Sequence, residues 1–546
     1  MKKIGCVAAA AMLAVSMCGV SACGKKNVDN PETLDIYLLY KGYQDEWLTS
    51  TIELFKNEDW VKEKYPNLTV NYTNDGIDST AGSKLSAGGS INKYDLMFGV
   101  NLFSYDATGV TMDLTDALYL SEVPGEEGVK VIDKVPEHKL KSLAAANGPE
   151  RADGGDSYYT VNYIDGMYSM LYNADILKDL NMQVPVTTKE FMDTCNTIKT
   201  GSGYQATVDG TTNTYNTAIM NSARSNYWNS SFSTWWAQYE GYDGYCNFYN
   251  GIHNKKRSNE VLKQTGRLRS LETIESIFRS GYSYESSAAI DYKTAQTNFL
   301  SGHGVFHYNG DYFASEMRLT IEALKGTGVD YDIRYMKMPV ISTVVEQLEY
   351  RDGENLMSDT MLAAIVREID NNVKYDDSVA KTNGVSKKDF NKIAEARQIS
   401  AYPAANAQTA VVPDYSPAKS VAVDFLRFMY TDKAISSFAR AAKGIRFPAK
   451  YEYTQEDLAS FSSICKSGYE VKTGTSNYPF IELPPVQSFA LGKAGLSALA
   501  SFKGVFEVLW STPDQTTTAL DLYNADITHW NETSWGQMIA RAGYSV

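Results

Sequence analysis

The stretch Thr33-Leu-Asp-Ile-Tyr-Leu-Leu-Tyr40 decides the class of fold. Its apolar and polar residues alternate and favour extended backbone, which predicts a strand. Residues 46–65 follow with apolar side chains at helical spacing, and this helix should end before Pro66. Further strands are expected at 68–72 and 94–98. The alternation of strand, helix and strand predicts an α/β fold with a parallel sheet.

Two loops follow the carboxyl ends of these strands, at residues 40–43 and 99–103. Ligands of open α/β sheets bind beyond such ends. We therefore expect a ligand site that includes Tyr40, Lys41, Tyr43 and Asn101.

Aromatic residues are concentrated further along the chain. The protein has 38 Tyr, and residues 227–249 contain ten aromatic side chains. Many of these recur at helical spacing, which is typical of a helix that packs into a core. Since aromatic rings also match the apolar faces of sugars, we expect Trp228 and Trp235 to reach a ligand. Residues 370–395 are charged and poor in apolar side chains, which indicates a surface insertion.

The N-terminus has the pattern of a bacterial export signal. Lys2 and Lys3 precede an apolar stretch, and Val20-Ser-Ala-Cys23 resembles the lipobox, in which the Cys receives the lipid. We expect cleavage before Cys23 and lipidation of its thiol, with the polar residues up to 33 as a tether. The alternative is an ordinary signal cut after Ala22. No later segment has the roughly 18 apolar residues that a membrane span needs.

Charge and cysteine content exclude several classes of function. Loss of the two lysines with the signal takes the net charge from −14 to −16, so the body should repel nucleic acid and anionic membrane. Cys195, Cys246 and Cys465 remain after cleavage, which allows at most one disulfide. About 524 residues remain, enough for at least two lobes.

Sequence patterns of common enzymes and metal sites are absent. There is no Gly-x-Ser-x-Gly, His-Glu-x-x-His or phosphate-binding Gly-Lys-Thr/Ser motif. His303 and His307 are four residues apart, but their glycine-rich surroundings favour a strand, on which they would lie too far apart to share a metal. We expect no metal and no cofactor. Two carboxylates of a glycoside hydrolase stay possible, because a sequence does not show their separation.

Six motifs occur in order between residue 34 and the C-terminus. They are the strand and loop 34–43, Tyr94-Asp-Leu-Met-Phe-Gly99, Met112-Asp-Leu-Thr-Asp-Ala-Leu118, Gly166-Met-Tyr-Ser-Met-Leu-Tyr-Asn173 with Val184-Pro-Val-Thr-Thr-Lys-Glu-Phe191, Phe299-Leu-Ser-Gly302 with Gly310-Asp-Tyr312, and Ser416-Pro-Ala-Lys-Ser-Val-Ala-Val-Asp-Phe425. Together they resemble motifs of the extracellular solute-binding proteins of carbohydrate ABC importers, the broad family that includes maltodextrin-binding proteins.

The resemblance implies a type II periplasmic-binding-protein-like fold, in which crossover strands join two α/β lobes and the ligand lies between them. It assigns 34–157 with 339–450 to the N-terminal lobe and 158–338 with 451–546 to the C-terminal lobe, after a signal peptide at 1–22 and a tether at 23–33.

The resemblance also adds ligand-binding candidates. Asp165 lies on the crossover, near where family members place a sugar-binding carboxylate, and Gln408 lies in the strand before the Ser416 helix. Asp311 and Tyr312 come from the Gly-x-aromatic motif, in which Tyr312 replaces the usual Trp. Asn162 stands where the family has Pro, and the region 340–412 is longer than in compact members.

These features imply a lipid-anchored, monomeric substrate-binding subunit rather than an enzyme. It would capture a carbohydrate, such as an oligosaccharide, by lobe closure and deliver it to the membrane permeases of an ABC importer. The membrane would be reached through the lipid alone, on the outer face of the cytoplasmic membrane. The alternatives are a surface sugar receptor or adhesin without transport, and an exported glycan-active enzyme.

Overall fold

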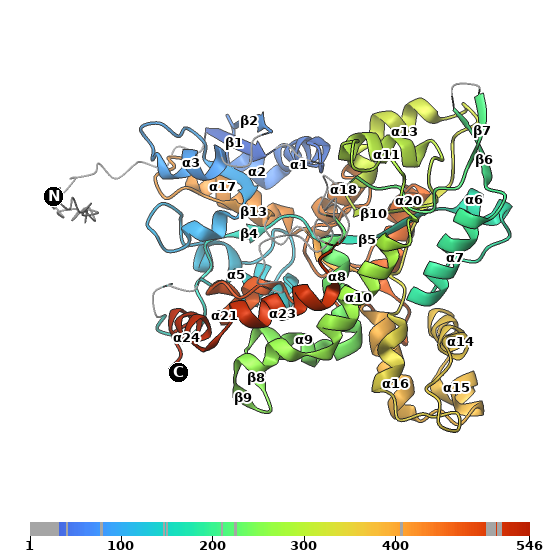
Figure 1. Ribbon diagram of the computed structural model, residues 1–546. Helices are drawn as coiled ribbons and strands as arrows, with labels where there is room; N and C mark the ends of the chain where they lie inside the picture. Colours follow the sequence, from blue (N-terminus) through green and yellow to red (C-terminus); the bar gives the residue numbers. More distant parts are fainter. Residues whose placement is uncertain are drawn as a thin grey trace, which may run out of the picture.

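Two bodies, each built on its own sheet, make up the described part of the chain (Figure 1). The computed structural model describes residues 32–39, 42–76, 80–145, 148, 151–208, 211–222, 227–404, 408–497, 509 and 516–545. We call 32–164 with 408–460 the first lobe, and 165–404 with 461–545 the second lobe. Cys23, Tyr40 and Lys41 lie outside the described residues.

The first lobe has a five-stranded sheet in the order β2-β1-β3-β13-β4. Its strands are β1 (Thr33–Leu39), β2 (Thr69–Asp75), β3 (Leu96–Val100), β4 (Val161–Asn162) and β13 (Gln408–Val411). β1 pairs in parallel with β2 and β3, which confirms the predicted parallel arrangement there. β13 runs antiparallel to β3 and β4, so the sheet is mixed.

Helices cover both faces of this sheet because its strands alternate their side chains. Ile36 and Leu38 pack on one side with Phe55 of α1, while Tyr37 packs on the other side with Leu85 of α3. The helices of this lobe are α1 (Glu46–Asn57), α2 (Asp59–Lys64), α3 (Thr80–Ser86), α4 (Val131–Lys134), α5 (Glu137–Leu143), α17 (Lys419–Met429), α18 (Asp432–Ala441) and α19 (Gln455–Ala459), which packs against α18.

The predicted helix 46–65 is two helices in the structure. The extended backbone of Glu58, with φ −63° and ψ 133°, separates α1 from α2. Side-chain periodicity continues across this break, which is why the sequence does not reveal it.

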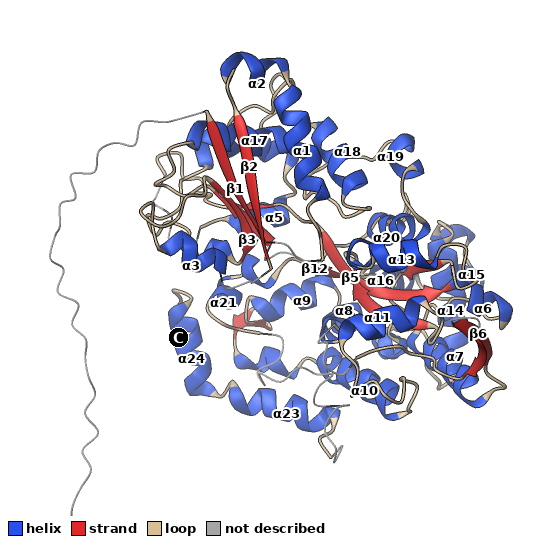
Figure 2. Cartoon of the chain, turned by 90° about the horizontal axis from the view of Figure 1, so that it is seen from above, coloured by secondary structure: helices blue, strands red, loops and turns tan. Residues whose placement is uncertain are grey.

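The second lobe is built around β5 (Gly166–Asn173), the next strand after β4 in the chain; Figure 2 shows β5 among the helices of this lobe. It pairs antiparallel with β10 (Phe306–Gly310), β11 (Ile333–Met336) and β12 (Tyr402–Ala404). Two further hairpins pair β6 (Tyr204–Val208) with β7 (Thr211–Tyr215) and β8 (Ile252–His253) with β9 (Lys256–Arg257).

Most of the second lobe is helical. Its helices are α6 (Ala174–Asp179), α7 (Thr188–Thr200), α8 (Asn229–Glu240), α9 (Tyr242–Tyr249), α10 (Thr265–Arg279), α11 (Tyr292–Leu300), α12 (Phe313–Glu316), α13 (Arg318–Leu324), α14 (Asp359–Asp370), α15 (Val379–Thr382), α16 (Lys387–Gln398), α20 (Ser463–Thr473), α21 (Ala490–Lys493), α23 (Ala519–His529) and α24 (Glu532–Arg541). α7 is capped at its N-terminus, where the Thr187 side chain accepts a hydrogen bond from the Glu190 backbone N–H.

The lobe boundaries differ from those that the resemblance assigned. Val340, Ile341 and Ile399 are buried with the aromatic helix α8, so the region 339–404 packs in the second lobe rather than the first. Tyr158 and Val161 are buried in the first lobe, although they were assigned to the other one. The lobe to which each region belongs is decided by the residues that it packs against, and these residues are distant in the sequence.

The charged region 370–395 is also more than a surface insertion. Phe390 and Ile393 of α16 are buried in the second-lobe core beside Ile365 of α14. No helix in the described ranges is both long and apolar enough to cross a membrane.

Candidate functional site

Tyrosine side chains meet where the two lobes face each other. Tyr312, in the turn between β10 and α12, lies at their centre. Its ring centroid lies 5.5 Å from that of Tyr43 in the first lobe, 6.1 Å from Tyr168 on β5 and 6.3 Å from Tyr227 before α8. All three contacts are edge-to-face, the arrangement that aromatic quadrupoles favour. We call Tyr43, Tyr168, Tyr227 and Tyr312 the interlobe aromatic cluster.

Two glycines make room for the Tyr312 ring. A Cβ atom on Gly310 would lie 2.1 Å from Tyr312 Cε1, and one on Gly42 would lie 2.9 Å from Tyr312 Cδ2. Gly42 belongs to the first lobe and Gly310 to the second. The close approach of the lobes at this point therefore depends on residues without side chains.

A second contact joins the lobes beside the cluster. Arg318 of α13 forms an ion pair of 3.1 Å with Glu46 at the start of α1. Both side chains are partly exposed, at 46% and 38%, so this pair lies at the edge of the interface. This ion pair and the contact between Tyr43 and Tyr312 show that the two lobes touch each other in this structure.

The predicted tryptophans lie behind the cluster rather than in it. Trp228 is buried against Tyr308, with ring centroids 5.2 Å apart, and Tyr308 stacks on Tyr168. The Trp228 indole N–H has no hydrogen-bond partner among the described residues. Trp235 is fully buried and donates to the carbonyl oxygen of Pro339 at 3.0 Å. Trp235 therefore packs in the core in this conformation.

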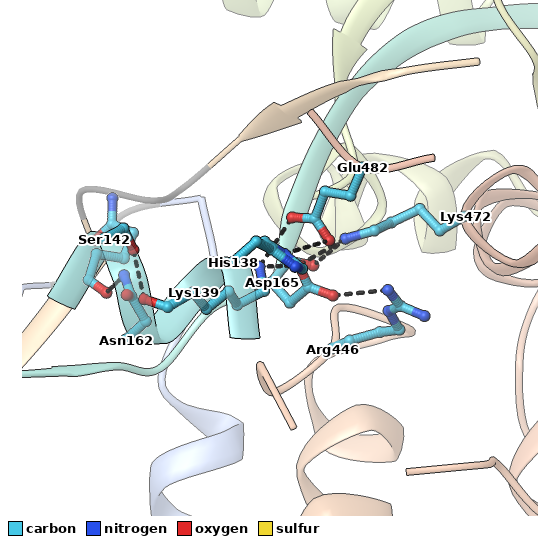
Figure 3. Close-up of polar contacts among 9 residues, drawn as sticks. His138, Lys139, Ser142, Asn162, Asp165, Arg446, Lys472 and Glu482 are labelled. Atoms are coloured by element: carbon cyan, nitrogen blue, oxygen red, sulfur yellow. Dashed lines mark hydrogen bonds and ion pairs between the residues drawn. The ribbon is translucent and has the colours of Figure 1, made fainter. Parts of the chain in front are cut away.

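The predicted crossover carboxylate, Asp165, is the centre of a buried group of charges (Figure 3). Its Oδ1 accepts from Lys139 at 2.7 Å and from Lys472 at 2.8 Å, and its Oδ2 accepts from Arg446 at 2.7 Å. Glu482 accepts from Lys139 at 2.9 Å. We call these five residues the hinge ion cluster.

The hinge ion cluster joins both lobes to the crossover. Lys139 and Arg446 belong to the first lobe, while Lys472 and Glu482 belong to the second. Burial alone would raise the pKa of Asp165, but the three neighbouring cations hold it well below its usual range. Both carboxylate oxygens therefore contact protein cations, and Asp165 holds the crossover in place in this structure.

Asp311, next to Tyr312, is a buried acid of a different kind. Burial raises its pKa to about 7, against the opposing charge of Lys472. Its backbone N–H donates to Met167, but its Oδ1 has no hydrogen-bond partner within the described ranges.

Asn101 follows the carboxyl end of β3, as the strand-end argument predicts, and Gln408, a candidate from the resemblance, lies beside that end. Gln408 pairs with Val100 in the sheet, and its side-chain oxygen accepts from the Tyr163 hydroxyl at 3.1 Å. Asn101 is exposed, with a left-handed φ of 57°.

The sequence interpretation did not single out Tyr168, Tyr227 or the cations around Asp165. Tyr227 lies in the aromatic stretch 227–249 and Tyr168 in the motif 166–173, but their spacing does not show which rings face the other lobe. Lys139, Arg446 and Lys472 are spread over more than 300 residues and have no local pattern.

Comparisons with known proteins bear on the fold. No family model and no curated protein matches the sequence. Among solved structures, a chitin oligosaccharide binding protein is similar at TM-score 0.55 and 14% identity, covering 92% of this chain and 99% of its own. A probable secreted solute-binding lipoprotein from Streptomyces coelicolor has TM-score 0.54 and 11% identity, with coverages of 92% and 99%. RafE in complex with raffinose has TM-score 0.51 and 13% identity, with coverages of 91% and 99%.

These similarities extend over nearly the whole of each matched chain, at identities that bear on architecture alone. The two sheets and the crossover from β4 to β5 make this a two-lobed architecture. The chain has the two-lobed type II fold of the carbohydrate solute-binding proteins.

Proposed function

We propose that the protein is the carbohydrate-capturing subunit of an ABC importer, and that its lobes close around the sugar and present it to membrane permeases. The observation that carries this proposal is the interlobe aromatic cluster, centred on Tyr312, in a fold that sugar-binding proteins share. The body would act as a monomer.

Tyrosine rings suit this task because they combine an apolar face with a polar hydroxyl. Burial raises the pKa of Tyr312 and of Tyr43 well above its ordinary value, so both rings are neutral and can donate to sugar oxygens. A micromolar dissociation constant corresponds to about −8 kcal/mol. Stacked rings contribute on the order of 1 kcal/mol each beyond area burial, and satisfied hydrogen bonds contribute a similar amount.

The hinge ion cluster supports a closing motion with a defined axis. Since Asp165 holds cations from both lobes, the crossover is a fixed point about which the lobes can rotate. A ligand shifts such an equilibrium by binding the closed state better than the open state. Contacts from both lobes, such as Tyr43 and Tyr312, provide that difference.

The sequence before the first lobe supports attachment to the membrane. Val20-Ser-Ala-Cys23 fits a lipid anchor at Cys23, followed by a polar tether. An anchor of two or more acyl chains binds stably. The tether would keep the acidic body close to the permeases on the outer face of the cytoplasmic membrane.

A thermal-shift screen tests the proposal. The mature chain is melted with mono- and oligosaccharides, raffinose and chitin oligosaccharides among them, and with peptides and polyols as a comparison set. A sugar that binds the native state raises the melting temperature. A shift with peptides or polyols and with no sugar would overturn the substrate class, and turnover of a glycan would overturn binding without catalysis.

The aromatic cluster is tested by the variant Tyr312→Ala. Calorimetry should show the best sugar of the screen bound at least about tenfold more weakly, since about 1.4 kcal/mol of stacking is lost. The matched control is Tyr544→Ala, at a tyrosine 38% exposed near the C-terminus. Equal affinity for the two variants would remove Tyr312 from the site.

A further inference from the structure

A small cavity lies between the lobes, on the hinge side of the aromatic cluster. Asp311, Tyr335 and Lys472 line it from the second lobe, and Lys443 and Arg446 line it from the first. It therefore brings together side chains that move relative to one another when the lobes open or close.

Two polar atoms at this cavity are buried without a partner. Asp311 Oδ1 and Arg446 Nε have no hydrogen bond to any residue that the structure describes. Most buried polar atoms in proteins are satisfied, because leaving one unpaired costs about 1–3 kcal/mol. One of these atoms is an acceptor and the other a donor, and they belong to different lobes.

The charges around the cavity are also unbalanced. Within the hinge ion cluster itself, the three cations Lys139, Lys472 and Arg446 meet two carboxylates, those of Asp165 and Glu482, so the five residues carry one positive charge in excess. Burial lowers the pKa of Lys472 although Asp165 lies beside it. A buried cation needs a counter-charge, and Asp311 is the acid that shares a cavity with two of these cations.

We propose that Asp311 is a closure residue: its carboxylate pairs with Arg446 across this cavity as the lobes close, and so favours the closed state. Asp311 directly precedes Tyr312, whose ring contacts Tyr43 of the first lobe, so a ligand that holds Tyr312 against the first lobe also holds Asp311 near Arg446. This role for the ligand rests on the proposed function, whereas the pairing itself does not.

The surroundings of Asp311 define how closure depends on pH. The charged and titratable groups near it are Lys443 and Arg446 from the first lobe, Cys465, Tyr469 and Lys472 from α20, Tyr335 from β11, Asp165 from the crossover, Glu316 from α12, and the tyrosines Tyr43 and Tyr168. Burial holds the pKa of Asp311 at about 7 in this conformation, with Lys472 opposing it.

Pairing with Arg446 requires the ionised carboxylate, so it lowers that pKa. Closure is then favoured as pH rises through about 7 and is weakened below it. For each unit by which pairing lowers the pKa of Asp311, the equilibrium constant for closure is about tenfold larger at high pH than at low pH.

The decisive experiment is the melting temperature of Asp311→Asn at pH 8.5, where the carboxylate is ionised. If Asp311 pairs with Arg446, the substitution removes an ion pair and lowers the melting temperature. If it stays unpaired, the substitution removes a buried uncompensated charge and raises the melting temperature, which would overturn the proposal. The control is Asp330→Asn, at an exposed aspartate of the same lobe, which should melt like the wild type.

Small-angle scattering of the ligand-free chain reports on closure. The radius of gyration of the wild type and of Asp330→Asn should fall between pH 5.5 and 8.5, while that of Asp311→Asn should not. A wild-type radius that does not change with pH would refute the coupling to closure. If the melting and scattering results hold but raffinose and the other sugars fail to bind, the proposed function fails and the pairing stands.

Discussion

Replacement of Glu482 by Gln measures the strength of the hinge ion cluster. Burial alone would raise the pKa of Glu482, but the adjacent Lys139 cation lowers it from 4.5 to about 2. That shift of roughly two and a half units, at about 1.36 kcal/mol per unit, corresponds to about 3 kcal/mol of folding stability. Gln has the shape of Glu without the charge, so the variant should lose about this amount at pH 7.

The pH dependence of the loss identifies its cause. Because the folded-state pKa of Glu482 is lower than the unfolded one, its stabilisation is present above about 4.5 and disappears as pH falls toward 2. The free energy of unfolding, measured with urea and tryptophan fluorescence, should therefore differ between wild type and Glu482→Gln by about 3 kcal/mol at pH 7. The difference should shrink steadily below pH 4.5.

A matched substitution separates this effect from a general loss of charge. Glu349 also pairs with a lysine, Lys388, but the two side chains are 65% and 76% exposed. Exposed pairs contribute little, so Glu349→Gln should leave the free energy of unfolding nearly unchanged. Two results would refute the assignment of this stability to a buried ion pair. One is that Glu482→Gln lowers the free energy of unfolding no more than Glu349→Gln does, and the other is that it lowers it equally at pH 7 and at pH 3.

Two other substitutions test the packing that holds the site and the C-terminal helices. Gly310→Ala places a Cβ atom against the Tyr312 ring, so it should change the near-ultraviolet circular dichroism and cost about 1–3 kcal/mol of stability. Gly76→Ala meets no atom within 4 Å and is the control; equal effects would contradict the close approach. Asp526→Asn removes the partner of Arg267 in a pair that is 0% exposed on both sides, and should cost about 3–5 kcal/mol. Because Arg267 lies in α10 and Asp526 in α23, limited proteolysis should then cut α23 and α24 sooner than in the wild type. An unchanged cleavage rate would show that this ion pair does not hold the C-terminal helices in place.

Local patterns predicted much of the fold because each depends on neighbours in sequence. The alternation in 33–40 predicted β1. The aromatic spacing in 227–249 predicted helices packed into a core, and α8 and α9 are buried there. The strand-end argument placed Tyr43 in the loop that meets the second lobe.

The sequence did not predict contacts between residues that are far apart in the chain, and these contacts decide which lobe a helix belongs to. The apolar faces of α14 and α16 are visible in the sequence, but either lobe could bury them. Asp165 was expected as a sugar contact on the basis of its position on the crossover. Its partners Lys139, Arg446 and Lys472 come from three separate segments, so only the folded chain shows that its oxygens meet cations.

The sequence by itself determined the α/β class, the acidic body and the aromatic stretches, and it predicts an export signal, because composition and spacing carry that information locally. The tertiary structure decided which lobe each helix joins and which tyrosines face across the interface. It also decided that both carboxylate oxygens of Asp165 contact cations, whereas Oδ1 of Asp311 has no hydrogen-bond partner among the described residues. The physical reason is that burial and charge pairing depend on the distance between side chains in space, and the residues concerned are separated by up to 343 positions in the chain.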